Sequence, residues 1–330
     1  MSGVDAKGGS TKDAGTKPVV AVVGAGAWGT ALAIQAARAG ADVTLWARDP
    51  ARLAGESPHL PGIPLPPAIR VTGTLPEDAA LILMAVPMQH MRAVLGRMRP
   101  RAPIVLCCKG VETGTLRLPL EIAAEIQADV PAALLTGPNF AREVALGLPA
   151  ATVAAATDPA LRRRIAALLG TPGFRIYGND DPIGAQIGGA AKNVIAIASG
   201  AVIGAGLGEN ARAALVTRGL AELARLAVAL GGRAETVHGL SGLGDLLLTC
   251  TGESSRNYSL GFALGQGATL AEILAGRNSV TEGVATAPAL VARAGDVELP
   301  ICRAVAALVS GRATLREAMD ALLARPLRDE

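Results

Sequence analysis

A lysine and an asparagine interrupt a long apolar stretch near the middle of this 330-residue chain. The stretch spans residues 187–203, and Lys192 and Asn193 lie inside it. Its length and composition predict a buried helix, in which an unpaired charge would cost several kcal/mol. A carboxylate partner, a ligand or a lowered lysine pKa could offset that cost. Lys192 is therefore a candidate functional residue, and the alternative is a lysine whose ammonium group reaches water.

Two polar segments follow this stretch. Asp245 and Thr249 are four residues apart, so one face of a helix can hold both. Ser255, Arg256 and Asn257 open a further helical pattern, and a helix start that carries arginine and hydroxyl groups can bind an anion. The alternative for the second segment is an ordinary helix cap beside a solvated arginine.

A glycine-rich turn near the start of the chain must position these groups against a cofactor. An apolar strand at 18–23 leads into Gly24, Gly26 and Gly29, then a helix at 30–39 and a strand at 42–46. In such a βαβ unit the first glycine allows the tight turn, the second lets the backbone approach a pyrophosphate, and the third allows close helix–strand packing. The helix N-terminus then faces the phosphates.

The end of the second strand bears on the choice of dinucleotide. Arg48 would favour a 2′-phosphate, whereas the adjacent Asp49 would favour a free 2′-hydroxyl. We expect NADP to be usable and leave NAD open.

Strands and helices alternate as far as residue 183, and the pattern is helical from there to the end. Strands are expected at 81–87, 102–110, 132–136, 150–156 and 174–177, with a proline-rich loop over 51–74 at the sheet edge. Lys109 and Asn139 follow strands, where open parallel sheets bind ligands. The predicted fold is an α/β Rossmann-type domain over 18–183 and an all-α domain over 184–330, after a disordered tail at 1–17.

Composition limits the other classes of function. Hydrophobic residues make up 50% of the chain and aromatic residues 2%, and the net charge is +3 without any block of like charges, which argues against nucleic-acid binding. The four cysteines and three histidines have no metal-ligand spacing, and we expect no metal. The polar N-terminus has no signal-peptide pattern, and Lys192 makes the apolar stretch a poor membrane span. We expect a cytoplasmic protein.

Together these groups suit the reduction of a ketone. A dinucleotide supplies hydride, and an acid must stand beside the developing alkoxide. Lys192 can be that acid if burial and Asp245 tune it, and cations elsewhere can hold a phosphate. A phosphorylated hydroxy-ketone is the substrate that these residues favour.

Several spaced motifs resemble the NAD(P)-dependent sn-glycerol-3-phosphate dehydrogenases, in their bacterial biosynthetic branch. The similarity covers nearly the whole chain, and its motifs occupy residues 22–32, 109–110, 136–143, 188–197, 242–246, 249–250, 255–257 and 282–283. The resemblance implies reversible hydride transfer between NAD(P)H and dihydroxyacetone phosphate, which yields sn-glycerol 3-phosphate for phospholipid synthesis. It also implies a homodimer in the cytosol.

The resemblance assigns roles to individual residues. Lys192 would donate and accept the proton, supported by Asp245. The substrate would be bordered by Lys109, Gly137, Asn139, Lys192, Asn193, Asp245, Thr249, Ser255, Arg256 and Asn257. The dinucleotide would be lined by Gly24, Gly26, Ala27, Trp28, Gly29, Arg48, Lys109, Ala141, Arg256, Val280 and Glu282.

The chain departs from the bacterial pattern at three places. The bacterial branch more often has serine or threonine at position 139, whereas this chain has Asn139, like the eukaryotic cytosolic branch. Met88 replaces the usual serine. The loop after Asp49 is shorter than usual. Asn139 is expected to keep its substrate contact, whereas Met88 and the shorter loop bear on cofactor contacts and on the choice between NAD and NADP.

Two other functions fit parts of the sequence. A related two-domain dehydrogenase could act on a hydroxy acid or a sugar phosphate. A non-catalytic dinucleotide-sensing module would have lost Lys192 or Asp245, and both are present.

Overall fold

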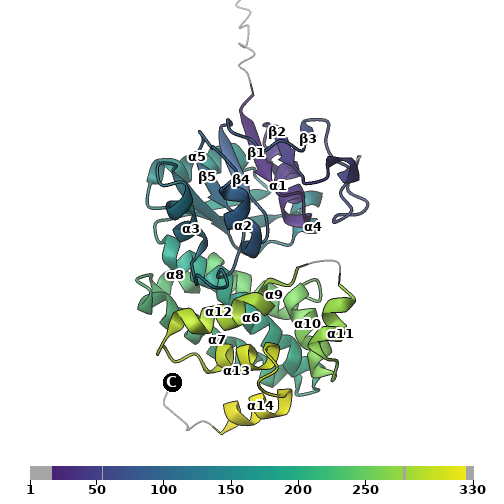
Figure 1. Ribbon diagram of the computed structural model, residues 1–330, viewed down its shortest axis with the longest axis vertical. Coiled ribbons are helices and arrows are strands. Elements are labelled where there is room, and N and C mark those ends of the chain that lie inside the picture. Colours follow the sequence, from purple (N-terminus) through teal and green to yellow (C-terminus); the bar gives the residue numbers. More distant parts are fainter. Residues whose placement is uncertain (1–16, 54, 278–279, 325–330) are drawn as a thin grey trace, which may run out of the picture.

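A computed structural model of the chain describes residues 17–53, 55–277 and 280–324. Figure 1 shows two layers of structure along the long axis, a sheet flanked by helices and, beyond it, a cluster of helices alone. We call these the dinucleotide half and the helical half. The predicted disordered tail lies outside the described residues except for Lys17.

One eight-stranded sheet forms the centre of the dinucleotide half. Its order is β3-β2-β1-β4-β5-β6-β7-β8, and neighbouring strands are parallel except for the antiparallel pair β6 and β7. The central strands are apolar because helices cover both faces. The strands are β1 Val19–Val23, β2 Asp42–Trp46, β3 Ile69–Thr72, β4 Leu81–Met84, β5 Ile104–Leu106, β6 Ala132–Thr136, β7 Ala150–Ala155 and β8 Phe174–Asn179.

Short helices connect these strands. They are α1 Ala27–Arg38, α2 Met88–Leu95, α3 Pro119–Ile126, α4 Ala141–Leu146 and α5 Pro159–Leu169, with a 3₁₀ turn at Pro50–Leu53. The sequence did not predict α4, which has six residues and begins directly after the turn at 137–140.

The expectation of a loop over 51–74 is wrong for its last part. Residues 69–72 form strand β3, which pairs with β2 from Val43 opposite Ile69 to Trp46 opposite Thr72. Ile69 and Val71 favour a strand conformation, whereas the prolines that precede them indicate a loop.

The helical half is built around helix α6, Pro182–Gly204. Every residue of α6 from Gly184 to Val202 is buried. Asp181 caps the helix by accepting from the backbone N–H of Gly184. The surrounding helices are α7 Gly208–Ala229, α8 Ala234–His238, α9 Asp245–Thr251, α10 Arg256–Gly265, α11 Leu270–Ala275, α12 Glu282–Ala294, α13 Pro300–Val309 and α14 Leu315–Leu323.

Glycines let α10 lie directly against α6. A Cβ added to Gly200 or Gly204 of α6 would collide with backbone oxygens of α10, and one added to Gly261 would collide with the backbone oxygen of Ile197. Small residues therefore permit a helix spacing that larger side chains would prevent. By length and composition α6 could cross a membrane, but 83% of its most apolar window is buried inside the protein.

The predicted fold class is confirmed, with a Rossmann-type sheet followed by helices only. The sheet ends at Asn179 and α6 begins at Pro182. The boundary between residues 183 and 184 stays a prediction.

Candidate active site

Three charged side chains meet where the two halves join. The Asp245 carboxylate lies 2.5 Å from the Lys192 ammonium through Oδ1 and 2.5 Å from the Lys109 ammonium through Oδ2. Lys192 also donates to Oγ1 of Thr249, at 2.9 Å. Lys109 belongs to the dinucleotide half, whereas Lys192 and Asp245 belong to the helical half, so the ion pairs of Asp245 connect the two halves.

Burial gives these charges their chemical character. Lys192 is 8% exposed and Asp245 is fully buried. Desolvation lowers the pKa of Lys192 to about 8, against the opposing effect of Asp245 and with a further lowering by Lys109. A lysine that titrates near neutral pH can exchange protons with a substrate. The alternative of an ammonium group that reaches bulk water does not hold.

Local sequence explains how Asp245 faces Lys192. A π-helical turn at Leu240–Gly244 leads directly into α9, whose first residue is Asp245. Gly242 of this turn packs on α6, because a Cβ on Gly188 would lie 3.0 Å from the Gly242 Cα. Thr249, one turn later, donates to the Asp245 backbone oxygen at 2.6 Å and so presents its hydroxyl oxygen to Lys192.

Lys109 reaches the cluster from the end of β5. Its ammonium group also donates to the Gly137 carbonyl at 3.3 Å. Gly137 has φ +146°, and a Cβ there would lie 3.1 Å from Cα of Thr152. Asn139 donates its amide to the Ala151 carbonyl at 3.3 Å. The carboxyl ends of β5 and β6 thus carry the predicted groups Lys109, Gly137 and Asn139 side by side.

A second set of polar contacts joins the start of α10 to α6, the helix that carries Lys192. Asn257 donates to Oδ1 of Asn193 at 2.9 Å and accepts from the backbone N–H of Gly283 at 3.0 Å. Ser255 caps α10 by accepting from the N–H of Tyr258. Arg256 is exposed at the first position of the helix. The predicted anion-binding residues therefore neighbour Lys192 through Asn193.

The glycine-rich turn has room for a dinucleotide. Gly24 has φ +111°, and a Cβ on Gly29 would collide with the Gly24 carbonyl oxygen, so both positions require glycine. By contrast, a Cβ placed on Gly26, which is exposed, would meet no described atom within 4 Å beyond its immediate chain neighbours. Helix α1 begins there without a side-chain cap. Its free N–H groups and open backbone fit the pyrophosphate of NAD or NADP.

The other residues expected to line the cofactor are spread around this turn. Ala27 and Trp28 form the first turn of α1 and are half-buried, as is Ala141 at the start of α4. Arg48 is exposed just after β2, and Val280 is exposed just before α12. The roles of these five residues in holding the cofactor stay predictions.

Glu282 shows an unsatisfied buried group beside this region. Its Oε1 accepts from the Met88 backbone N–H at 3.1 Å, whereas its Oε2 has no hydrogen-bond partner among the described residues. Burial raises the pKa of the Glu282 carboxyl, although the Met88 N–H and Arg256 oppose that rise. A ligand that donates a hydrogen bond would satisfy Oε2.

Sequence reasoning missed two buried hydroxyls at the same junction. Thr136 ends β6, and a Cβ on Gly189 of α6 would lie 2.9 Å from its Oγ1. Thr286 lies on α12 beside Gly110. Both hydroxyls lack a partner in the described part of the chain. The position of Thr136 at a strand end was a usable signal, whereas nothing in the sequence singled out Thr286.

Comparison with known proteins gives a consistent family. The family pattern described as "NAD-dependent glycerol-3-phosphate dehydrogenase N-terminus" matches residues 19–162, and the corresponding C-terminus pattern matches residues 181–320. The glycerol-3-phosphate dehydrogenase (NAD(P)+) of Acidiphilium cryptum is 57% identical over 95% of this chain and 98% of that protein. That of Gluconobacter oxydans is 52% identical over 94% of this chain and 98% of that protein.

Solved structures agree with these sequence matches. The crystal structure of glycerol-3-phosphate dehydrogenase from Coxiella burnetii superposes with a TM-score of 0.89 at 36% identity. The superposition covers 94% of this chain and all of that one (100%).

Proposed function

Because this chain belongs to the NAD-dependent glycerol-3-phosphate dehydrogenase family, we propose that Lys192 exchanges the proton in the reaction that the family's name describes. The chain is an NAD(P)-dependent oxidoreductase that interconverts dihydroxyacetone phosphate and sn-glycerol 3-phosphate. The observation that carries the proposal for Lys192 is its burial between Asp245 and Thr249, with a pKa lowered to about 8.

Lys192 supplies the acid that ketone reduction requires. When bound, the dinucleotide supplies the hydride that adds to the carbonyl carbon. Negative charge then develops on the carbonyl oxygen, and the Lys192 ammonium stabilises that charge and donates its proton. In the reverse direction the neutral amine accepts the proton of the alcohol. Reduction therefore needs protonated Lys192 and slows as pH rises through about 8, whereas oxidation gains over the same range.

Asp245 and Lys109 set the state of Lys192. Asp245 holds the ammonium group in place and favours its charged form. Lys109, on the other carboxylate oxygen, weakens that effect and so keeps the proton transferable. We assign Lys109 to the substrate border as well, since its side chain is the more exposed of the two lysines.

The other polar residues would hold the ends of the substrate and the cofactor. Ser255, Arg256 and Asn257 at the start of α10 would bind the phosphate, with Asn193, Asn139, Gly137 and Thr249 completing the border. The dinucleotide would bind along Gly24, Gly26, Ala27, Trp28, Gly29, Arg48, Ala141, Val280 and Glu282, with Arg256 between the two ligands. The open space over Gly26 supports this arrangement.

We extend the proposal to the cellular setting that the family resemblance implies. The product would feed phospholipid synthesis, and the enzyme would act in the cytosol as a homodimer. Gel filtration with light scattering of the purified protein tests the dimer directly.

Lys192→Met tests the role of Lys192. Loss of a general acid costs about 10²–10⁴-fold in rate, so we expect NADPH oxidation with dihydroxyacetone phosphate to fall by that factor. Energy transfer from Trp28 to bound NADPH should persist, because the cofactor residues are unchanged. Lys17→Met, at an exposed lysine, is the matched control. Near-normal turnover of Lys192→Met would refute the assignment, and a preference for a hydroxy acid or sugar phosphate would favour the related dehydrogenase.

A further inference from the structure

Helix α12 contacts the dinucleotide half along a single stripe. Glu282 accepts from the N–H of Met88, Thr286 lies against Gly110, and Arg293 donates to the Leu116 carbonyl at 2.8 Å and to Oε1 of Glu121 at 2.6 Å. Residues 282, 286 and 293 are spaced by four and seven positions, which places them within about 40° of one another on a helix. The stripe is about 16 Å long.

A neighbouring stripe of α12, about a quarter turn around the helix, packs into the helical half. Gly283, Ala287, Leu290 and Ala294 are buried, and the last three lie in the apolar core around α6. Gly283 also touches the active site, because its N–H donates to Asn257. Helix α12 is therefore part of the helical half and lies at its border with the dinucleotide half (Figure 1).

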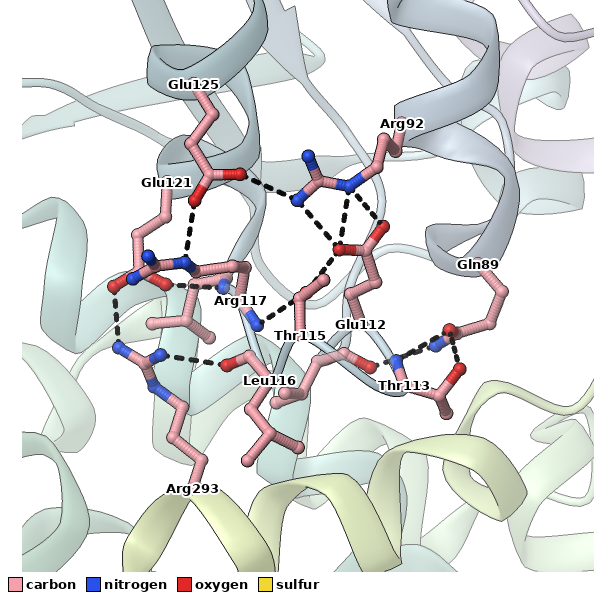
Figure 2. Close-up of polar contacts among 12 residues, drawn as sticks. Gln89, Arg92, Glu112, Thr113, Thr115, Leu116, Arg117, Glu121, Glu125 and Arg293 are labelled. Carbon is pink, nitrogen blue, oxygen red and sulfur yellow. Dashed lines mark hydrogen bonds and ion pairs between the residues drawn. The ribbon is translucent and has the colours of Figure 1, made fainter.

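Arg293 acts on the segment that follows Lys109. We call residues 110–118 the β5–α3 loop. Figure 2 shows how side chains of α2 hold this loop. Arg92 makes hydrogen bonds of 2.9 and 3.0 Å to Glu112 and one of 2.9 Å to Glu125. Gln89 donates to the Val111 carbonyl and accepts from Thr113. The side of the loop that faces α2 is thus fixed to the dinucleotide half.

The apolar side of the same loop packs into the helical half. Val111 and Leu118 are buried members of the core around α6, and Leu116 packs against it. Leu116 is also the one non-glycine residue with positive φ in the described ranges, at 60°. A bulky residue keeps that conformation only where its surroundings hold it. Arg293 bonds the carbonyl of this residue, so it clamps the strained point of the loop.

We propose that Arg293 is a positioning residue that fixes the β5–α3 loop, and with it Lys109, against Asp245 of the helical half. The inference rests on the proposed roles of Lys109, Asp245 and Lys192. Asp245 and Lys192 both lie in the helical half, whereas Lys109 precedes the clamped loop in the dinucleotide half. Releasing the clamp therefore separates Lys109 from the other two and admits water between the halves.

The primary test compares two variants of Arg293, near the end of α12, with one variant of Arg303 on α13. Arg293→Met removes the clamp, and Arg293→Lys keeps a charge that can reach one acceptor but loses the two-pronged bond. Arg303→Met is the matched control, because Arg303 donates to the Gly295 and Val297 carbonyls within the helical half. Each purified protein is assayed for kcat and KM with dihydroxyacetone phosphate, for NADPH binding by tryptophan energy transfer, and for thermal unfolding.

We expect Arg293→Met to lower kcat/KM by about tenfold to 100-fold, the cost of misplacing a catalytic group by about 1 Å. Arg293→Lys should recover part of the loss, and NADPH binding should stay within about twofold because the Gly24–Gly29 turn is untouched. Arg303→Met should keep the kinetics of the natural protein.

The pH profile separates positioning from mere stability. Lys192 faces Asp245 and Cys250 on α9 and Lys109 after β5. Water entry and the departure of Lys109 both favour protonated Lys192, so the alkaline limb of reduction, near pH 8 in the natural protein, should move to higher pH. A loss of stability alone would leave that limb in place.

Two outcomes would overturn the inference. One is Arg293→Met with kinetics and a pH limb equal to those of Arg303→Met. If Arg293→Met does not fold, Glu121→Gln replaces it in the test. Glutamine can still accept from the Leu118 N–H at the start of α3, but it loses the ion pair with Arg293. The second refuting outcome is an alkaline limb of the pH profile that is unchanged in Glu121→Gln. Lys192→Met is measured alongside, because its normal turnover would refute the proposed function and not the clamp alone.

Discussion

Replacing Asp245 with asparagine should shift the pH dependence of reduction toward acid. The carboxylate lies 2.5 Å from each of two lysine ammonium groups. Asparagine has the same shape and keeps one acceptor oxygen, which can face Lys192. Its amide group then faces Lys109, which has access to solvent and can turn away. The change therefore removes one charge and preserves the packing around it.

The magnitude follows from the distance. At an effective dielectric constant of about 20, unit charges 2.5 Å apart attract by about 6–7 kcal/mol before desolvation is counted. We take about a third of this, about 2 kcal/mol, as the net loss, because asparagine keeps a hydrogen bond and burial offsets much of the gross attraction. That energy is about 30-fold in the protonation equilibrium of Lys192.

The assay is initial-rate NADPH oxidation with dihydroxyacetone phosphate from pH 5.5 to 9.5. The alkaline limb should fall clearly below pH 8, so that the rate at pH 7.5 drops about tenfold and part of it returns at pH 6. Asp78→Asn, at an exposed acid, is the control. A limb that stays at pH 8 or moves higher would refute the claim that Asp245 maintains the charge of Lys192.

Two substitutions in the glycine-rich turn should differ in effect, and a third tests the packing of α6 against α10. Gly26→Ala should fold normally, because its Cβ enters open space. It should weaken NADPH binding at least about tenfold in a fluorescence titration, since the added methyl group occupies the space through which the pyrophosphate approaches the backbone. Gly29→Ala should instead lower the free energy of unfolding by about 1–3 kcal/mol, because its Cβ meets the Gly24 carbonyl oxygen; equal thermal stability of the two variants would contradict this. Gly200→Ala should destabilise the helical half by a similar amount in denaturant unfolding, because it forces α10 away from α6, and unchanged stability would show that the helices can separate freely.

The parts of the fold that depend on neighbouring residues could be predicted from the sequence. The Gly24–Gly29 turn and the apolar helix around Lys192 are local patterns of spacing and composition, and both are present. Strand β3 was missed because its four residues gain their stability from pairing with β2, which no local pattern records.

The charged contacts depend on distant parts of the chain. Asp245 was expected near Lys192 through the family motif, but its bond to Lys109 joins residues 136 positions apart. Arg293 and Glu121 are 172 positions apart, and each alone has the sequence context of an ordinary surface residue. Such pairs follow from how the two halves are placed against each other, and a pattern of spacing within one helix cannot show that placement.

The burial of α6 also has a consequence for biosynthesis. Helix α10 packs directly on α6 and ends about 60 residues later in the chain. At a synthesis rate of about 5–20 residues per second, roughly 3–12 s therefore pass between the completion of α6 and that of α10. During that interval α6 is an apolar segment long enough to enter a membrane. A lysine at the centre of such a segment opposes insertion by about 2.5–3.5 kcal/mol. Lys192 thus helps to keep the nascent helix in water until the rest of the helical half can enclose it.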